Sequence, residues 1–376
     1  MAQFLDVSIM YTTGLVAGHN ASFHESLALA ARKAGHTFTV AARAKGAAEN
    51  DELVSVRLAS KSWYAIADQL TYELRDAAPR IVMVYEGDLQ CLEAFKQLAR
   101  DATQHVFLIN LFRPEHLLNM PRNAISRRTT SDAFGSLTEL ADELPPNVKV
   151  LAETDRRARI ARHLGLDVLD TWPLHSALAG MADIGNVGRT APALALIAVN
   201  NWQLEHHHST LSDLHAVLRR SRRWAPDIQF ELLGSVNLSR RRWAPRRGVL
   251  RRLPGSSTGP LPMAGYACRL ASAGIVWLPT QDYYTGQSSG KALDALVLGK
   301  PLLIPSGTFG QQQQDRWVPG ALTYRTLTEL FDILDKLPAM IEGWTFDLRS
   351  QRTAIREEYS ADHAIARLHE IATGVR

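Results

Sequence analysis

The sequence contains few of the residues that build covalent or metal crosslinks. Cysteine occurs only twice in 376 residues, at Cys91 and Cys268, which excludes a disulfide framework and a cysteine-based zinc site. No segment approaches the roughly 18 uninterrupted apolar residues of a membrane-spanning helix. Residues 1–6 also lack the basic stretch and following apolar run of a secretory signal. We therefore expect a cytoplasmic protein.

Lysine is scarce too, and the positive charge is unevenly distributed. Only eight of the 42 basic residues are lysine. The segment Arg219–Arg252 holds eleven arginines against Asp227 and Glu231, a local charge of +9. Because the whole chain carries +4, the remainder carries −5. The mild total charge therefore hides an acidic protein with one strongly basic segment, which favours an anionic partner.

The composition is otherwise that of an ordinary globular protein. Hydrophobic residues make up 46% and charged residues 21%, which argues against disorder or a fibrous repeat. At roughly 100–200 residues per domain, a chain of 376 residues is expected to form two domains. Each domain would be large enough to bury its own core.

Apolar runs of strand length alternate with helical spacing along the chain. Asp88, for example, is placed to cap a helix that carries Leu92 and Phe95 on one face. Strands separated by helices of this length form right-handed βαβ units and a parallel, doubly wound sheet. Strands are expected at residues 7–11, 37–41, 53–58, 81–85, 105–111, 148–152, 194–199, 228–233, 274–278 and 301–304.

The alternation breaks once, at residues 174–191, which are rich in glycine and alanine. We interpret this break as the connection between domains. The fold class is therefore α/β, with two Rossmann-like domains at 1–175 and 191–352 joined by a linker at 176–190. Two such domains indicate a shared cleft, and ligands in open α/β sheets bind beyond the carboxyl ends of the strands.

The loop most suited to chemistry follows the strand that ends at Leu278. Its small residues let the backbone approach a ligand, and the helix after it offers free N–H groups and a dipole that favour an anion. Lys291 adds a positive charge, and Asp294 lies one turn further on, within reach of ribose hydroxyls when a diphosphate occupies the helix start. The alternative is an ordinary turn with a serine cap and a solvated lysine. The candidate loop residues are Gly286, Gln287, Ser288, Ser289 and Gly290.

The continuation of this loop, ALDALVLGKPLLIP, resembles the donor-binding segment of GT-B glycosyltransferases, especially their large retaining family. Asp294-Ala295 falls on the family's second Glu-Ala, and Gly299-Lys300-Pro301 matches directly. The resemblance implies that Asp294 holds the ribose of a nucleotide sugar. The family's first Glu falls on Gly286, and the nearest substitute is Asp282, a candidate catalytic carboxylate. This departure leaves open whether the sugar's anomeric configuration is kept.

The resemblance extends along nearly the whole chain. The N-terminal stretch TTGLVAGHNASFHESLALAARKAGHTFTV is similar to the family's first loop and helix, and that loop faces the acceptor and the diphosphate. It implies Gly18 and Asn20 as acceptor-side residues and His19 as a catalytic candidate, against the alternative of a surface histidine. The tail EEYSADHAIARLHEI is similar to the family's last helix. Residues 353–376 are therefore expected to cross back and pack on the first domain.

Two further strand ends of the first domain are expected to face the cleft. Glu86 follows one buried strand and is a candidate acceptor-side base. Asn110 and Arg113 lie at the end of another and are candidates for binding the acceptor.

The donor diphosphate needs positively charged partners, and the position that supplies them in the resembling family does not supply them here. The resembling family places an Arg and a Lys after the strand that ends at Val199, and this chain has neither before Arg219. Arg240 and Arg241 are the proposed replacements. Three adjacent histidines at 206–208 point in different directions on a helix or loop, unlike the i, i+4 pairs that bind metals. With no Asp-x-Asp either, we expect no metal and no cofactor.

These features predict a metal-independent glycosyltransferase that moves a sugar from a nucleotide-diphosphate sugar to a glycan, a lipid-linked glycan or a small metabolite. One alternative is a sugar-nucleotide epimerase of the same architecture. Another is a non-catalytic protein that binds nucleic acid or anionic lipid through Arg219–Arg252, with Trp224 and Trp243 at a membrane interface. A peripheral position on the inner membrane face would suit the lipid version, whereas nucleic acid is the less favoured partner.

Overall fold

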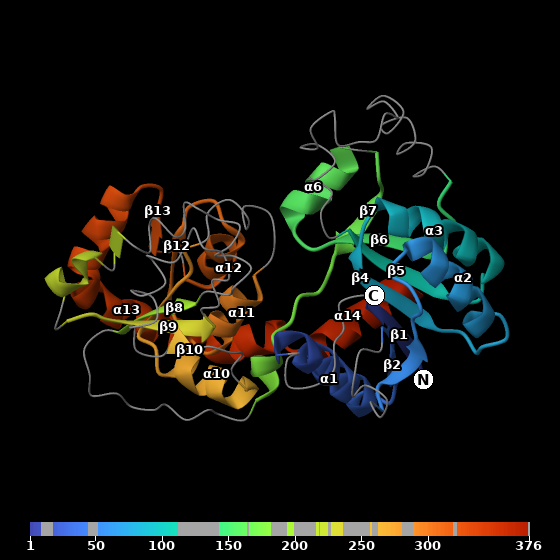
Figure 1. The fold of residues 1–376 in the computed structure, drawn as a ribbon, viewed down its shortest axis with the longest axis horizontal. Helices are drawn as coiled ribbons and strands as arrows, with labels where there is room; N and C mark the ends of the chain where they lie inside the picture. Colours follow the sequence, from blue (N-terminus) through green and yellow to red (C-terminus); the bar gives the residue numbers. More distant parts are fainter. Residues whose placement is uncertain are drawn as a thin grey trace. The chain divides into compact units, whose positions relative to one another are not determined.

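The structure is a computed structural model, and it divides the chain into two compact units (Figure 1). The first unit comprises Met1–Leu174 and Ala361–Arg376, and the second comprises His175–Ser360. The chain thus passes from the first unit to the second after Leu174 and returns after Ser360. The structure describes residues 1–8, 18–43, 52–111, 143–163, 165–181, 194–198, 216–217, 219–224, 227–235, 256–257, 262–279, 289–318 and 322–374.

The first unit is built on a seven-stranded sheet in the order β3-β2-β1-β4-β5-β6-β7, in which all neighbouring strands are parallel. Its central strands are apolar because helices cover both faces. The strands are β1 (Gln3–Ser8), β2 (Thr37–Ala42), β3 (Val54–Arg57), β4 (Ile81–Gly87), β5 (Val106–Leu111), β6 (Val148–Ala152) and β7 (Val168–Thr171).

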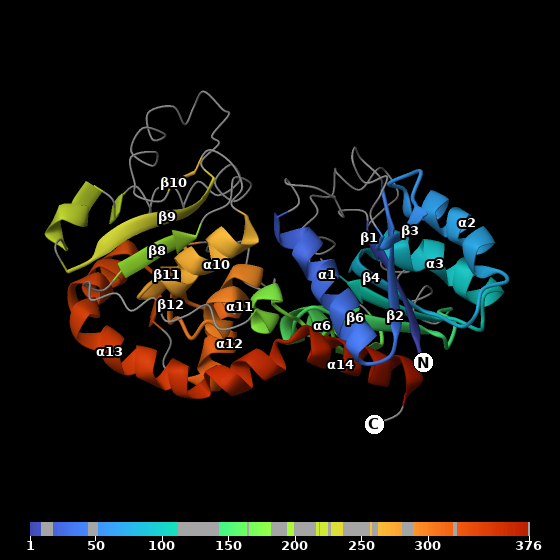
Figure 2. The same cartoon turned by 90° about the horizontal axis from the view of Figure 1, so that it is seen from below.

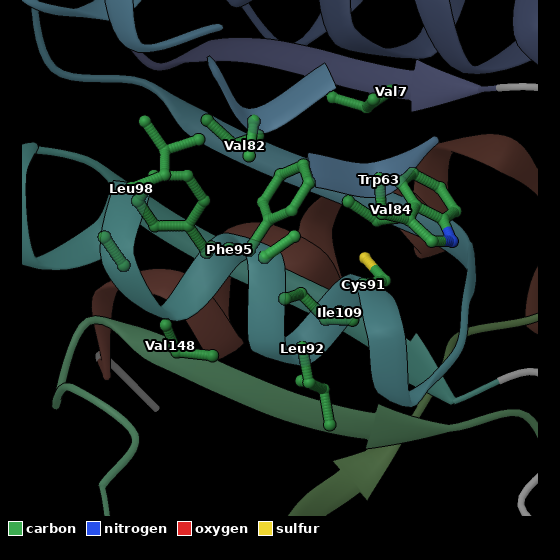
Figure 3. Packing of buried hydrophobic residues seen from close by; sticks show 14 of the residues in the cluster. Val7, Trp63, Val82, Val84, Cys91, Leu92, Phe95, Leu98, Ile109 and Val148 are labelled. Carbon is green, nitrogen blue, oxygen red and sulfur yellow. The ribbon is translucent and has the colours of Figure 1, made fainter. Parts of the chain in front are cut away.

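Two hydrophobic clusters hold helices against the two faces of this sheet. On one face pack α2 (Trp63–Leu74), α3 (Leu89–Asp101) and α6 (Asp155–His163). Figure 3 shows part of this cluster, with Phe95 of α3 between Val82 and Val84 of β4 and Leu92 of α3 beside Ile109 of β5. The other face carries α1 (Gly18–Lys33) and α14 (Ala361–Thr373). These two helices pack side by side (Figure 2).

The second unit contains a six-stranded parallel sheet in the order β10-β9-β8-β11-β12-β13. Trp277 and Tyr324 are buried in its core, where Trp277 Nε1 donates to the Tyr324 hydroxyl over 3.0 Å. The strands are β8 (Leu194–Ala198), β9 (Gln229–Ser235), β10 (Ser256–Ser257), β11 (Ile275–Trp277), β12 (Leu302–Pro305) and β13 (Leu322–Tyr324). The helices are α10 (Met263–Ala271), α11 (Gly290–Val297), α12 (Phe309–Trp317) and α13 (Leu327–Glu358), with 3₁₀ turns η2 (Ala177–Gly180) and η3 (Ser221–Arg223).

The predicted parallel α/β architecture is confirmed, with particular corrections. The first strand was expected at residues 7–11, but β1 begins at Gln3 and ends at Ser8. The cap at Asp88 is confirmed, since its side chain accepts the Cys91 N–H over 2.8 Å. Because α13 continues to Glu358, only the part of the expected terminal segment 353–376 from Ala361 onward belongs to the first unit.

The longest described helix, α13, has 32 residues. Neither it nor any other helix in the described ranges is apolar enough over a bilayer's thickness to span a membrane.

Candidate functional site

The start of α11 is the predicted anion site. Ser289 caps the helix: its side chain accepts the Ala292 N–H, and its carbonyl accepts the N–H groups of Ala292 and Leu293. Within the described part of the chain, no acceptor meets the N–H groups of Gly290 or Lys291. The helix dipole adds partial positive charge at the same place. The first turn of α11 therefore presents two amides and one lysine suited to an anion.

Lys291 as a whole is partly exposed, but its amine is buried among protein atoms that exclude water. Burial lowers its pKa to about 8, and the negative charge of Asp294 acts in the opposite direction. The ammonium is therefore charged under neutral conditions but close to its titration range.

Asp294, the residue expected to bind ribose, is only 1% exposed. The Ser176 hydroxyl donates to its Oδ1 over 2.5 Å, and the Tyr266 hydroxyl donates to its Oδ2 over 2.9 Å. Burial, and after it the charge of Asp294, raises the pKa of Tyr266 well above its ordinary value, so the phenol stays a donor. Contact between Asp294 and ribose stays a prediction, and both carboxylate oxygens already have hydroxyl partners.

The Gly-Lys-Pro motif ends α11. Gly299 has φ of 67°, a conformation in which glycine avoids the strain of a side chain. Its N–H donates to the Leu296 carbonyl over 2.8 Å, and the Lys300 N–H donates to the Ala295 carbonyl over 2.9 Å. The Pro301 carbonyl then accepts the Val276 N–H over 3.0 Å. The motif therefore turns the helix directly into β12 and fixes how α11 lies against the sheet.

The other candidate residues are placed to different extents. Gly18 is the first residue of α1, His19 and Asn20 follow it in the same helix, and Glu86 lies in β4. Asn110 of β5 is fully buried, and its Nδ2 donates to the Tyr85 carbonyl over 2.7 Å. The candidates that lie outside the described residues are Arg113, Arg240, Arg241, Asp282, Gly286, Gln287 and Ser288.

Sequence reasoning missed buried polar groups in the first unit. Asp6 of β1 lies 2.7 Å from Nδ1 of His24 in α1, and both side chains are buried. Glu153 forms an ion pair with the fully buried Arg157 and accepts the Tyr85 hydroxyl over 2.7 Å. A carboxylate inside an otherwise apolar strand was the available signal for Asp6.

The described part of the basic segment packs on α13. Trp224 is 5% exposed, lies in the hydrophobic core and donates from Nε1 to Asp335 over 2.8 Å. The suggestion that Trp224 lies at a membrane interface is therefore wrong, because its side chain is buried in the core of the second unit. Arg223 also pairs with Asp335, and the Arg220 guanidinium lies 4.5 Å from the ring centroid of Phe331. Arg219 and Arg222 are exposed.

A metal-binding arrangement is not found among the residues that the structure describes, which hold no group of three or more suitably placed His, Cys, Asp or Glu side chains. The histidines at 206–208 and Trp243 lie outside that part of the chain.

Comparison with known proteins rests on structure. No protein-family model and no curated protein matches the sequence. Sucrose-phosphate synthase from Thermosynechococcus elongatus matches with a TM-score of 0.67 at 13% identity, covering 100% of this chain and 99% of that one. HepE from Anabaena, solved in complex with UDP-glucose, gives 0.65 at 13% identity with full coverage of both chains.

Epimerases of similar architecture also match. UDP-GlcNAc 2-epimerase from Neisseria meningitidis, bound to UDP-GlcNAc, gives a TM-score of 0.58 at 14% identity and covers both chains fully. At identities this low, the structural agreement shows the fold alone. Its elements are two parallel Rossmann-like sheets and a C-terminal helix that returns to the first unit. The resemblance seen in the sequence is thereby confirmed at the level of fold: this chain has the GT-B fold.

Proposed function

We propose that the protein is a glycosyltransferase whose donor, a nucleotide-diphosphate sugar, binds with its diphosphate at the first turn of α11. The observation that carries this proposal is the combination of two N–H groups without a described acceptor and the Lys291 ammonium at one helix start. The shared fold supports it, because the GT-B structure of HepE was solved with UDP-glucose. The acceptor is a glycan, a lipid-linked glycan or a small metabolite.

The chemistry follows from where charge develops. As the bond between the anomeric carbon and the diphosphate oxygen breaks, its electron pair goes to that oxygen, and the acceptor's hydroxyl oxygen forms the new bond and loses its proton. Groups that bind the departing diphosphate more tightly than the intact donor lower the barrier. The α11 amides and Lys291 would do so without a metal, joined by the loop residues from Gly286 to Ser288 and by Arg240 and Arg241.

The acceptor side of the proposal falls on the first unit. Gly18, His19 and Asn20 lie at the start of α1, and Glu86 lies near the carboxyl end of β4. Strand ends and helix starts at this edge are where α/β domains bind ligands. Glu86 or His19 would take the acceptor's proton, and Asp282 would act near the anomeric carbon.

An epimerase is the second candidate, because an epimerase bound to UDP-GlcNAc shares this fold. Epimerisation needs acid and base groups on opposite faces of the sugar. The two candidates are separated by products: a transferase releases free nucleotide and a glycosylated acceptor, whereas an epimerase returns a nucleotide sugar of changed configuration.

The test is calorimetric titration of the full chain with UDP and with common nucleotide sugars. We expect Lys291→Ala to weaken binding about tenfold or more, because it removes a charge-assisted contact to phosphate. Lys336→Ala, on the exposed face of α13, is the matched control and should bind like the wild type. If the wild type binds no nucleotide or nucleotide sugar, yet binds nucleic acid in a strongly salt-dependent way, the proposal is wrong.

A further inference from the structure

Asp294 is held from two sides before any donor arrives. Ser176 is the N-cap of the 3₁₀ turn η2 and Tyr266 lies in α10, so hydroxyls from two separate parts of the chain meet one carboxylate of α11. The side chain is 1% exposed. Each carboxylate oxygen thus already accepts one hydrogen bond from the protein, in a side chain with almost no exposed surface.

Ser176 is itself held by contacts that do not involve α11. Its N–H donates to the Tyr359 carbonyl over 3.0 Å, and its Oγ accepts the Leu178 N–H over 3.2 Å. Arg356 binds the carbonyls of Ala179 and Met181 in the same turn. The hydroxyl that fixes Asp294 therefore belongs to a braced segment and is not free to swing away at little cost.

Lys291 lies one turn before Asp294 in the same helix, at the i, i+3 spacing that makes side chains neighbours on a helix surface. Among the described residues, two causes act on the pKa of this lysine: burial lowers it, and the negative charge of Asp294 raises it. The other elements packed against α11 are η2, α12, α13 and β12, and none of their described charged groups acts on it. Tyr266 faces Asp294 as a neutral donor. A carboxylate with a fixed position gives the ammonium a fixed electrostatic partner.

We propose that Asp294 is a positioning residue: Ser176 and Tyr266 hold its carboxylate within α11, where its negative charge stabilises the Lys291 ammonium that receives the diphosphate, and the carboxylate does not itself contact the donor. The inference rests on the proposed function for the identity of the ligand. The charge relationship between Asp294 and Lys291 exists in the free protein and can be measured there.

The first experiment measures the pKa of Lys291 in the ligand-free protein. The chain has only eight lysines, so lysine-selective ¹³Cε labelling gives a countable set of signals, and Lys291→Arg identifies the relevant one. We expect Asp294→Asn to lower the pKa of Lys291 from about 8 by about one unit or more. Ser176→Ala and Tyr266→Phe should lower it by smaller amounts. An unchanged value in Asp294→Asn would overturn the proposal.

Matched controls come from hydroxyl and carboxylate groups elsewhere. Tyr64→Phe removes a phenol that donates to Glu93 over 2.6 Å in the first unit. Asp335→Asn removes a carboxylate bound by Arg223 and Trp224 in the second unit. Neither should move the Lys291 signal. Because Ser176→Ala and Tyr266→Phe leave the carboxylate in place, they keep the test usable if Asp294→Asn folds poorly.

The second experiment compares UDP with inorganic pyrophosphate, which has no ribose. A positioning role predicts that Asp294→Asn weakens binding of both probes by the same factor and moves the alkaline loss of affinity to lower pH. A loss confined to UDP would place the carboxylate on the ribose and overturn the inference. If the wild type binds neither probe, the proposed donor site fails, and the pKa measurement alone still decides the role of Asp294.

Discussion

Ser176 and Asp294 lie 118 residues apart in the sequence and share a 2.5 Å hydrogen bond. Ser176 is the second residue of the second unit, directly after the chain leaves the first. The bond therefore connects the start of the second unit to α11, the helix whose first turn we propose binds the donor. A second hydrogen bond, from the Ser176 N–H to the Tyr359 carbonyl, connects the start of the second unit to its end, where the chain returns to the first unit.

Binding of a nucleotide diphosphate should weaken as the pH rises through about 8. Lys291 has a pKa lowered to about 8 by burial, so it is charged below that pH and loses its charge above it. Calorimetric titration with UDP between pH 6.5 and 9.5 should show this loss. Lys291→Arg, whose side chain stays charged throughout, should give a flatter profile if it binds at all. A wild-type profile that stays flat would contradict the role of Lys291.

The packing of α14 on the first unit should weaken in mild acid. His36 stacks on His369 of α14 with ring centroids 4.9 Å apart, and its Nδ1 accepts the Ala2 N–H over 3.2 Å. Burial first, then the charges of His369 and the N-terminal amine, lower the pKa of His36. The neutral ring is thus favoured on folding, and stability present above about pH 6.5 is lost as the pH falls toward the lowered pKa.

Hydrogen exchange of residues 361–373, corrected for intrinsic rates, measures this effect directly. Protection should fall between pH 7 and pH 5 in the wild type. His369→Phe keeps a stacked ring and removes the imidazole whose charge acts on His36, so it should show a smaller fall. Equal falls in both proteins would argue that the stacked pair does not control the docking of α14.

The buried ion pair between Glu153 and Arg157 should be costly to break from one side. Arg157 is fully buried and Glu153 is 2% exposed, so Arg157→Ala removes the cation that pairs with a buried carboxylate. We expect the first unit to lose about 3–5 kcal/mol of stability. Arg159→Ala, on the exposed side of the same helix, should cost little. Chemical denaturation followed by a probe in the first unit compares the two, and similar costs would show that burial of this pair is unimportant.

Gly299 gives the Gly-Lys-Pro motif a structural test. Its φ of 67° is strained for any residue with a side chain, so Gly299→Ala should cost about 1–2 kcal/mol. Gly299→Asn should cost less, because asparagine tolerates this conformation better. If donor binding persists in both variants at temperatures where they stay folded, the motif acts through the fold. A complete loss of binding in a stable Gly299→Ala protein would instead place the motif at the ligand.

The fold could be predicted because a strand that is buried on both faces appears in the sequence as a continuous apolar run. The strand β1 was misplaced for a related reason. Asp6 interrupts its apolar run, and the partner that makes a buried carboxylate tolerable there, His24, stands 18 residues later in the sequence. The strands β10 and β13, of two and three residues, are too short to leave a periodic signal.

The site could be predicted only where its residues are neighbours in the sequence. Ser289, Gly290 and Lys291 stand next to one another at a helix start, and a serine cap after a strand can be recognised from sequence alone. Ser176 and Tyr266 could not be, because their relation to Asp294 exists only after three elements have packed together. The resemblance gave Asp294 a ligand, whereas the structure gives it two protein partners.

The return of the chain to the first unit bears on how this protein is made. Ile365 and Leu368 of α14 are 1% exposed in the cluster that covers one face of the first sheet. Those residues leave the ribosome only after the entire second unit. The first-synthesised sheet must therefore wait, with that face partly uncovered, while 186 further residues emerge. The half of the protein that is translated first completes its core last.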